Sequence, residues 1–326
     1  MKINTILFIS LSNLGDIILT TPVIEKLRDL YPEAKIDVVT GAPGKKIFVL
    51  HPSVRDVHVL QDHRALGRRI RKLVCFHRMK YDLVVDLKGS LLPYLAGAGM
   101  SVGGFFDKGP VVPKPDLHKR SEHLSVLGKL TDTPYSFPRF FMPVTRLEKK
   151  EAQMILSGAG DVRKVLINPG AKSRLKRWPA DLYARLCDEL VRNQGCAVIV
   201  AGADEDRKTV DDMRGNCTEG FTDLCGKISV GCLAELMKGS DLVVTNDSAP
   251  LHIASAVDAP TVAIFGPTDE RKYGPLSRKS RVVRPGVLCR PCNRSLCTDG
   301  TDKGCLPGLR VEEVLVACRE ILEDRS

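Results

Sequence analysis

The stretch of sequence that decides the fold is LVVTNDSAPLHIASA, residues 242–256. Residues 242–245 form an apolar run typical of a buried strand, and residues 250–256 are typical of the helix that follows. Where a strand of a parallel sheet leads into a helix, free backbone N–H groups and the helix dipole favour an anion. We therefore expect phosphate to bind near Asp247 and Ser248, although either side chain could serve only as a helix cap.

The same alternation of apolar strands and amphipathic helices extends along the whole chain and predicts an α/β fold with parallel sheets. In the first half we expect strands at 5–11, 36–40 and 83–87 and a helix at 16–30. In the second half we expect strands at 164–168 and 197–201 and helices at 181–194, 233–238 and 310–323. The proline-containing stretch 132–163, with a charged helical segment at 147–156, is typical of a linker and hinge.

A chain of 326 residues exceeds one typical hydrophobic core, so we expect two domains, 1–155 and 156–326. Each half has the pattern of a doubly wound unit. Two such units in succession imply a cleft between them, where a ligand could contact both. The closing helix could pack back on the first domain.

The charge balance narrows the class of partner. The formal net charge is +10, which favours an anionic partner or surface. Much of this charge lies in 63–74, whose spacing predicts an amphipathic helix that is either a solvated face or a surface for acidic lipid or saccharide. Nucleic acid is not expected, because only 5% of the residues are aromatic and no known binding module is present.

The apolar stretch Thr5–Leu11 near the N-terminus could suggest a signal peptide. It is short, lacks a small-residue cleavage site and leads directly into Gly15, Asp16 and a helix, so we interpret it as a buried strand. No apolar run is long enough to span a bilayer. We therefore expect a cytoplasmic protein.

Two further segments join a predicted strand to a predicted helix. In the first, Ser12–Asp16, Gly15 permits a tight turn, and Asp16 is either an N-cap or a general base for an acceptor hydroxyl. The second, Asn168–Pro179, has four cations in six positions: Lys172, Arg174, Lys176 and Arg177. This loop is either a solvated basic surface or a site for a diphosphate leaving group. It lacks the GxxxxGK[ST] spacing of a Walker loop.

These segments, in this order, resemble glycosyltransferase family 9, the ADP-heptose:lipopolysaccharide heptosyltransferases. The resemblance covers nearly the whole chain. It is carried by Gly15-Asp16 with Thr20-Thr21-Pro22, Asp86-Leu87-Lys88-Gly89, Asn168-Pro169-Gly170-Ala171, Lys176-Arg177-Trp178-Pro179, Asn246-Asp247 and Phe265-Gly266-Pro267-Thr268. Each motif alone is weakly specific, but the ordered set is specific.

The resemblance implies a GT-B architecture of two Rossmann-like domains and an inverting, metal-independent transfer of heptose from ADP-heptose. By this resemblance Asp16 matches the base, Lys176 the lysine on donor phosphate, Ile228 a backbone contact to adenine and Asp204 an acidic contact to ribose. The full set of implied donor-binding residues is Ala171, Lys172, Arg177, Asp204, Ile228, Asp247, Ser248, Ala249 and His252. Some members have Asp-Thr-Gly where this chain has Asp247-Ser248-Ala249, which keeps the hydroxyl but replaces the glycine.

The resemblance also implies an anionic, lipid-linked saccharide acceptor of the lipopolysaccharide inner core. We expect it on the first domain, around Lys88–Lys108 and the basic segment 63–74. Such an acceptor places the protein peripherally at the inner face of the cytoplasmic membrane. No cofactor or metal is expected for catalysis, because cations and a helix dipole can stabilise the departing diphosphate.

Four of the eleven cysteines form a loop of their own: Cys289, Cys292, Cys297 and Cys305. Four thiols at this spacing could bind structural zinc or an iron–sulfur cluster, remain reduced, or include a disulfide. The other seven are scattered and are most simply small apolar packing residues. We assign the cysteine loop no catalytic role.

Three other functions stay open at the level of sequence. A family member could use another nucleotide sugar and glycan, or could bind a nucleotide sugar without turning it over. A nicotinamide-dependent oxidoreductase is the alternative of a different class, because Gly97–Gly103 is similar to a dinucleotide fingerprint. That run has one extra residue before its last glycine and no clear strand directly before it.

Overall fold

The computed structural model describes residues 2–59, 76, 78–104, 117–131, 139–294, 297 and 304–324. The chain divides into two compact units, Met1–Pro143 and Val144–Ser326. The helix α6 (Arg146–Gly158) begins with a capping box between Thr145 and Glu148 and packs against α9 (Val230–Lys238). The division therefore falls before α6, earlier in the chain than the predicted boundary at residue 155.

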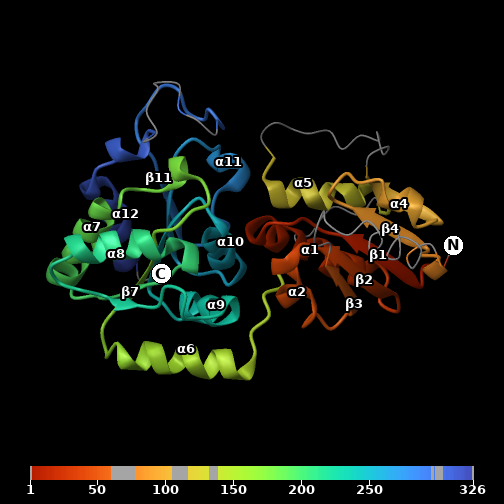
Figure 1. The fold of residues 1–326 in the computed structure, drawn as a ribbon, viewed down its shortest axis with the longest axis horizontal. Coiled ribbons are helices and arrows are strands. Elements are labelled where there is room, and N and C mark those ends of the chain that lie inside the picture. The colour runs from red at the N-terminus through yellow and green to blue at the C-terminus, as the bar shows by residue number, and fades with distance from the viewer. Residues whose placement is uncertain are drawn as a thin grey trace. The chain divides into compact units, whose positions relative to one another are not determined.

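The first unit is a five-stranded parallel sheet in the order β3-β2-β1-β4-β5 (Figure 1). Its strands are β1 (Thr5–Ile9), β2 (Lys35–Thr40), β3 (Val54–Val59), β4 (Leu83–Asp86) and β5 (Met100–Gly103). The helices described in this unit are α1 (Leu14–Leu30), α2 (Ala42–Phe48), α4 (Leu92–Leu95), α5 (Lys119–Ser125) and the 3₁₀ turn η1 (Val126–Lys129).

The second unit is a six-stranded parallel sheet in the order β11-β10-β9-β6-β7-β8. Its strands are β6 (Lys164–Asn168), β7 (Ala197–Val200), β8 (Thr222–Asp223), β9 (Leu242–Asn246), β10 (Thr261–Ile264) and β11 (Ser280–Val283). Its further helices are α7 (Ala180–Gln194), α8 (Arg207–Asn216), α10 (Ala249–Ala256), α11 (Glu270–Tyr273) and α12 (Val311–Glu323), with 3₁₀ turns η2 (Arg174–Lys176), η3 (Asp204–Asp206) and η4 (Leu306–Gly308). Two parallel-sheet α/β units confirm the predicted fold class.

Both strand orders place the functional segments by the same rule. Each sheet grows outward in two directions from a central pair, β1 with β4 and β6 with β9. The loops that leave the carboxyl ends of such a pair diverge, and ligands of doubly wound sheets bind at that point. Asp16 follows β1, the basic loop follows β6, and Asp247 follows β9. Asp16, the basic loop and Asp247 therefore lie at the switch points of the two sheets.

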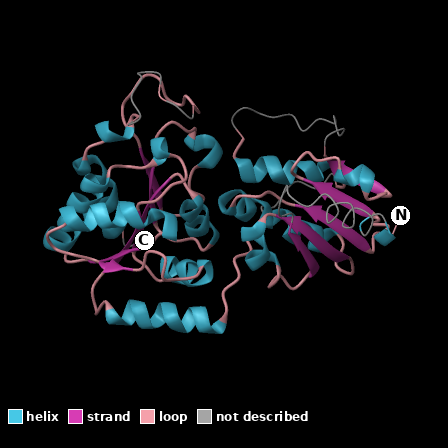
Figure 2. Ribbon diagram, viewed as in Figure 1, coloured by secondary structure: helices cyan, strands magenta, loops and turns pink. Residues whose placement is uncertain are grey.

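The core of the second unit lies between its sheet and the helices α7, α8 and α12 (Figure 2). Trp178 and Tyr183 are fully buried there, and their rings meet edge to face with centroids 4.8 Å apart. Cys318 on α12 is also fully buried in this cluster. The buried face of α12 contacts α7, β9, β10 and β11, so the closing helix is part of the core of the second unit.

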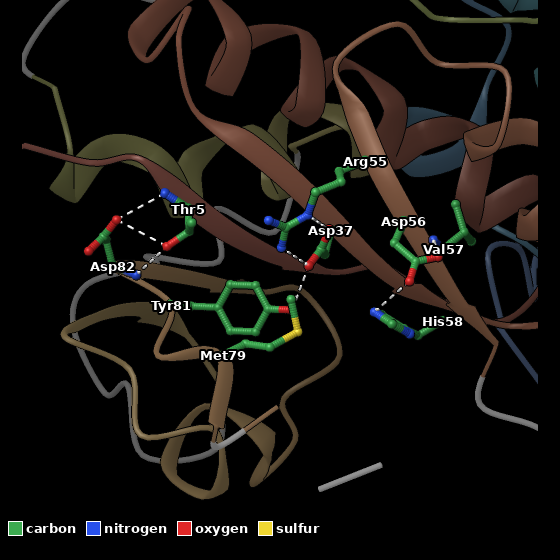
Figure 3. Close-up of polar contacts among 9 residues, drawn as sticks. All are labelled: Thr5, Asp37, Arg55, Asp56, Val57, His58, Met79, Tyr81 and Asp82. Carbon is green, nitrogen blue, oxygen red and sulfur yellow. Dashed lines mark hydrogen bonds and ion pairs between the residues drawn. The ribbon is translucent and has the colours of Figure 1, made fainter. Parts of the chain in front are cut away.

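A network of polar contacts links the strands of the first sheet (Figure 3). Asp37, fully buried on β2, accepts hydrogen bonds from Arg55 Nε at 2.9 Å and Nη2 at 2.5 Å, and from the Tyr81 hydroxyl at 2.7 Å. Asp82, directly before β4, accepts from the backbone N–H groups of Asn4 and Thr5, each at 2.9 Å. These carboxylates bind neighbouring segments together, and both lie away from the carboxyl ends of the strands.

The glycine run Gly97–Gly103 does not form a dinucleotide-binding turn. Such a turn leaves a strand and opens a helix. Here the run follows the short helix α4, and its last four residues are the edge strand β5. The structural basis for the oxidoreductase alternative is therefore absent from this segment.

Candidate functional site

Asp16 lies in the first turn of α1, directly after the switch-point strand β1. The N-cap of α1 is Asn13, not Asp16, and the Asn13 side-chain amide donates to Asp16 Oδ2 at 3.1 Å. Asp16 is half-buried, while Asn13 and Ser12 are exposed. The carboxylate is thus held near the surface without being used as a cap, which leaves it available as a base.

The loop after β4 brings a cation beside this position. The buried Asp86 carboxylate accepts from the backbone N–H of Lys88 at 2.8 Å and of Ser90 at 2.7 Å, which folds the loop back on itself. Lys88 Nζ then donates to Ser12 Oγ at 3.1 Å. The segments after β1 and β4 therefore meet at the first switch point, with Asp16 and Lys88 on them.

A histidine that sequence reasoning missed lies close to the candidate base. His123 is on α5, which packs against α1. Burial lowers the pKa of His123 to about 4, against the opposing charges of Glu122 and Asp16. His123 is therefore neutral at physiological pH. No local signal in the sequence connects it with Asp16, because the two are more than a hundred residues apart.

The basic loop after β6 is folded tightly around its own backbone. Ala171 is buried, and its carbonyl accepts from Arg177 Nε at 2.5 Å. Lys172 and Arg174 are exposed, while Lys176 and Arg177 are half-buried. The four predicted cations thus have two different environments. Arg177 stabilises the loop, whereas Lys172 and Arg174 extend into solvent.

Lys176 and Asp247 form an ion pair. Lys176 Nζ lies 2.7 Å from Asp247 Oδ2, and the Asp247 side chain is 3% exposed. The same carboxylate oxygen accepts from the Thr268 hydroxyl, which follows β10. The Lys176 ammonium also lies 5.9 Å from the centre of the Tyr273 ring, within range of a cation–π contact. Asp247 therefore holds the Lys176 ammonium at this point of the sheet.

Among the residues described, the side chains of Asp247 and Ser248 do not cap the helix α10 with a hydrogen bond. Asp247 is bound to Lys176 and Thr268. Ser248 occupies the N-cap position of α10, but within the described chain its hydroxyl makes no capping bond and instead donates to Asn246 O at 3.4 Å. Ala249 begins the helix, and His252 is buried one turn further on. Because Pro250 has no N–H, the first turn offers fewer donors to an anion than an ordinary helix.

A second group of predicted residues lies at the ends of β7 and β8. Asp204 is exposed, and its carboxylate packs so closely on Gly226 that a Cβ there would lie 2.1 Å from Asp204 Oδ1. Gly226 has a φ of +70°, and its N–H donates to Gly202 O at 2.9 Å. Ile228 is half-buried two residues later. The structure thus brings the predicted ribose and adenine contacts to one edge of the sheet.

The cysteine loop contacts the same edge of the second sheet. Arg290 is 5% exposed, and its guanidinium donates to Gly266 O and, at 3.4 Å, to Thr268 O. The N–H of Asn293 donates to Pro267 O at 2.8 Å. The thiols nearby are exposed at Cys289 and half-buried at the three others, Cys292, Cys297 and Cys305. Among the residues that the structure describes, no three His, Cys, Asp or Glu side chains converge as metal ligands.

The scattered cysteines act as packing residues where they are described. Five are buried: Cys187, Cys196, Cys225, Cys232 and Cys318. Burial raises the pKa of all five thiols, so they stay protonated. Cys217 is half-buried, and Cys75 lies outside the described residues.

Two predicted acceptor features cannot be placed. The basic segment 63–74 and residues 105–108 lie outside the described residues. Within the described ranges, no helix combines the length and the apolar character needed to cross a membrane.

The comparisons with known proteins agree with these features. The sequence matches the family described as glycosyltransferase family 9 (heptosyltransferase) over residues 68–301. It is 28% identical to lipooligosaccharide heptosyltransferase 2 of Haemophilus influenzae, across 86% of this chain and 88% of that protein.

Two solved structures share the fold along nearly the whole chain. One is a family 9 glycosyltransferase of Veillonella parvula, with a TM-score of 0.84 and 26% identity over 99% of this chain and 98% of the other. The other is the ADP-heptose lipopolysaccharide heptosyltransferase II of Escherichia coli, with a TM-score of 0.78 and 24% identity over 98% of each chain. Since the family match spans more than two thirds of the sequence, the chain is a glycosyltransferase and belongs to glycosyltransferase family 9.

Proposed function

We propose that this protein transfers heptose from ADP-heptose to an anionic acceptor of the lipopolysaccharide inner core, with inversion and without a metal ion. The observation that carries the proposal is the buried Asp247 holding Lys176 at the switch point of the second sheet. An ammonium group fixed at that edge is suited to a diphosphate. Relatives over most of the chain are heptosyltransferases of lipooligosaccharide and lipopolysaccharide.

The donor would lie along the carboxyl edge of the second sheet. Its diphosphate would meet Lys176, Lys172 and the start of α10, where Ser248 and Ala249 lie. Its ribose and adenine would meet Asp204 and the backbone at Ile228. The strand order supports this arrangement, because the loops after β6, β9, β7 and β8 leave one edge of one sheet.

In the reaction the acceptor hydroxyl attacks the anomeric carbon of the donor as the bond to the ADP phosphate oxygen breaks. Asp16 accepts the hydroxyl proton, and the electron pair of the broken bond leaves with ADP. Lys176 stabilises the negative charge that develops on the diphosphate. Proton removal by one carboxylate and charge stabilisation by one cation are sufficient because ADP is already a good leaving group.

The first experiment is calorimetric titration of the purified protein with ADP, UDP, GDP and NAD in buffer containing EDTA. We expect ADP to bind most tightly. Preference for UDP or GDP would keep the fold and change the donor. Binding of NAD alone would overturn the proposal in favour of an oxidoreductase.

The catalytic assignment is tested with Asp16→Asn. This change keeps the size of the side chain and its contact with Asn13 while removing the base. Transfer should fall at least 10²-fold, the lower end of what a general base contributes, and ADP affinity should stay within twofold. Near-normal turnover would remove Asp16 from the mechanism.

We also propose that any metal in the protein is structural and is held by the cysteine loop. Zinc and an iron–sulfur cluster both suit thiolate ligands, and reduced thiols or a disulfide are the alternatives. Elemental analysis of aerobically and anaerobically purified protein identifies zinc or iron, and titration of free thiols with and without reductant separates reduced thiols from a disulfide. Loss of transfer in EDTA from protein that carries no bound metal would contradict metal-independent catalysis.

A membrane-linked acceptor suggests a peripheral protein at the inner face of the cytoplasmic membrane. Exposed apolar side chains near the loop after β4, Leu91 and Tyr94, are available to such a surface. Sedimentation with anionic vesicles should exceed sedimentation with neutral vesicles and should weaken as salt is raised.

A further inference from the structure

Asn246, the last residue of β9, has a fully buried side chain that joins three segments. Its Oδ1 accepts from the Trp178 backbone N–H at 3.2 Å and from the Tyr183 hydroxyl at 3.0 Å. Its Nδ2 donates to Pro169 O at 2.8 Å and to Gly170 O at 3.4 Å. The partners fix the orientation of the amide, because carbonyl oxygens only accept and the Trp178 N–H only donates.

These contacts hold the basic loop at both of its ends. Pro169 and Gly170 open the loop, and Trp178 closes it. Between them lies Lys176, which pairs with Asp247, the residue directly after Asn246. Asn246 and Asp247, consecutive residues at the end of β9, therefore bind both ends of this loop and the Lys176 side chain between them.

We propose that Asn246 is a positioning residue that preorganises the basic loop for the diphosphate of the donor. This inference rests on the proposed function for the identity of the ligand. A loop fixed before the ligand arrives avoids the entropy cost of being ordered on binding. Asn246 does not touch the donor; it acts through the loop that carries Lys176.

The matched variants are Asn246→Asp and Tyr183→Phe. The first keeps the side-chain shape and an acceptor oxygen, but when ionised it offers Pro169 O and Gly170 O no donor. The second removes one hydrogen bond to the same Asn246 oxygen while leaving both ends of the loop bound. Trp178, the single tryptophan of the chain, is buried at the end of the loop, so its fluorescence reports whether each variant is folded.

Trypsin provides a readout that does not depend on activity. The loop carries four trypsin sites: Lys172, Arg174, Lys176 and Arg177. We expect Asn246→Asp to be cut in this loop at least tenfold faster than the natural protein under native conditions. Tyr183→Phe should be cut at the natural rate. ADP affinity should fall at least tenfold in Asn246→Asp and less than threefold in Tyr183→Phe.

Acidification provides a second test within one variant. Protonation of the carboxyl introduced by Asn246→Asp restores an O–H donor toward Pro169 O, so as pH falls its cleavage rate should approach that of the natural protein at the same pH, and ADP binding should return. The proposal is overturned if folded Asn246→Asp matches Tyr183→Phe in both cleavage and ADP affinity. If the natural protein binds no ADP, the proposed function fails, whereas the cleavage rates still decide whether Asn246 holds the loop.

Discussion

Asp37 and Asp247 are both buried carboxylates bound to a cation and a hydroxyl, yet they occupy opposite kinds of position. Asp37 lies within β2 and is held by the two-pronged guanidinium of Arg55 and by Tyr81 (Figure 3). Asp247 lies just beyond the end of β9, and its cation is the single ammonium of Lys176.

The two pairs differ in whether the cation can also bind a ligand. Arg55 binds both oxygens of Asp37 within β2, away from the carboxyl ends of the strands where ligands of such sheets bind. An ammonium has three donors, so Lys176 can keep Asp247 and still bind a phosphate oxygen. Arg55 with Asp37 is therefore a structural pair, and Lys176 with Asp247 is a pair that a ligand can share.

The largest expected effect is on the stability of the first unit. Arg55→Met keeps part of the apolar stem but leaves Asp37 buried without its cation, which should cost about 3 kcal/mol. Urea unfolding followed by circular dichroism should show an earlier transition. Trp178 fluorescence, which reports the second unit, and ADP affinity should be unchanged. Weakened ADP binding would remove the distinction between the two pairs.

The next effect is on donor binding in the second unit. Lys176→Ala should weaken ADP binding by roughly 1.5–3 kcal/mol, the range for hydrogen bonds to charged groups. Arg174→Ala is the control, because it removes an exposed cation from the same loop. Calorimetry should show a much smaller loss for the control. Equal losses would mean that the loop acts only through its total charge.

Two smaller effects distinguish the Tyr81 hydroxyl, which donates to Asp37, from the Thr268 hydroxyl, which donates to Asp247. Tyr81→Phe removes a donor to Asp37 and should lower the stability of the first unit by about 1–2 kcal/mol, without changing ADP affinity. Thr268→Val removes a donor to Asp247 and should weaken ADP binding a few-fold, because the carboxylate that positions Lys176 is less firmly held. If Thr268→Val changed stability alone, Asp247 would be a structural residue like Asp37.

The sequence predicts the junctions of the site well and their contacts poorly. The strand and helix bounds at the β1–α1, β6–α7 and β9–α10 junctions lie within two residues of those expected. Apolar runs, Gly and Pro are local signals, and they determine these bounds. The resemblance also indicated the family correctly.

The contacts that distinguish the two pairs are not local. Asp37 binds Tyr81, 44 residues away, and Asn246 binds Trp178, 68 residues away. No periodicity connects such residues, so one sequence cannot show that Asp247 holds Lys176 or that Asn246 holds the loop. Thr268 had a weaker signal, since it is a polar residue shortly after a buried strand and lies in one of the family motifs.

A third carboxylate, Asp223, tests whether position at a strand end or binding by protein groups determines which carboxylates serve the ligand. Its substitution has the smallest expected effect. Asp223 is the last residue of β8, much as Asp247 directly follows β9. Like the carboxylate of Asp37, however, that of Asp223 is bound by several protein groups, here two arginines and a backbone N–H. Burial alone would raise the pKa of Asp223, but Arg207, the Cys225 N–H and Arg214 lower it to about 2. If a carboxylate that is bound by several protein groups has a structural role, Asp223 is structural, as Asp37 is.

The pH dependence of stability then separates the alternatives. Because the pKa of Asp223 is lower in the folded than in the unfolded protein, its contribution is present above about pH 4 and is lost as pH falls toward 2. Asp223→Asn should therefore lower stability by about 1 kcal/mol at pH 7, after allowance for screening, and by almost nothing near pH 2. ADP affinity should stay unchanged. A loss of ADP affinity would mean that position at the strand end, not binding by protein groups, determines which carboxylates serve the ligand.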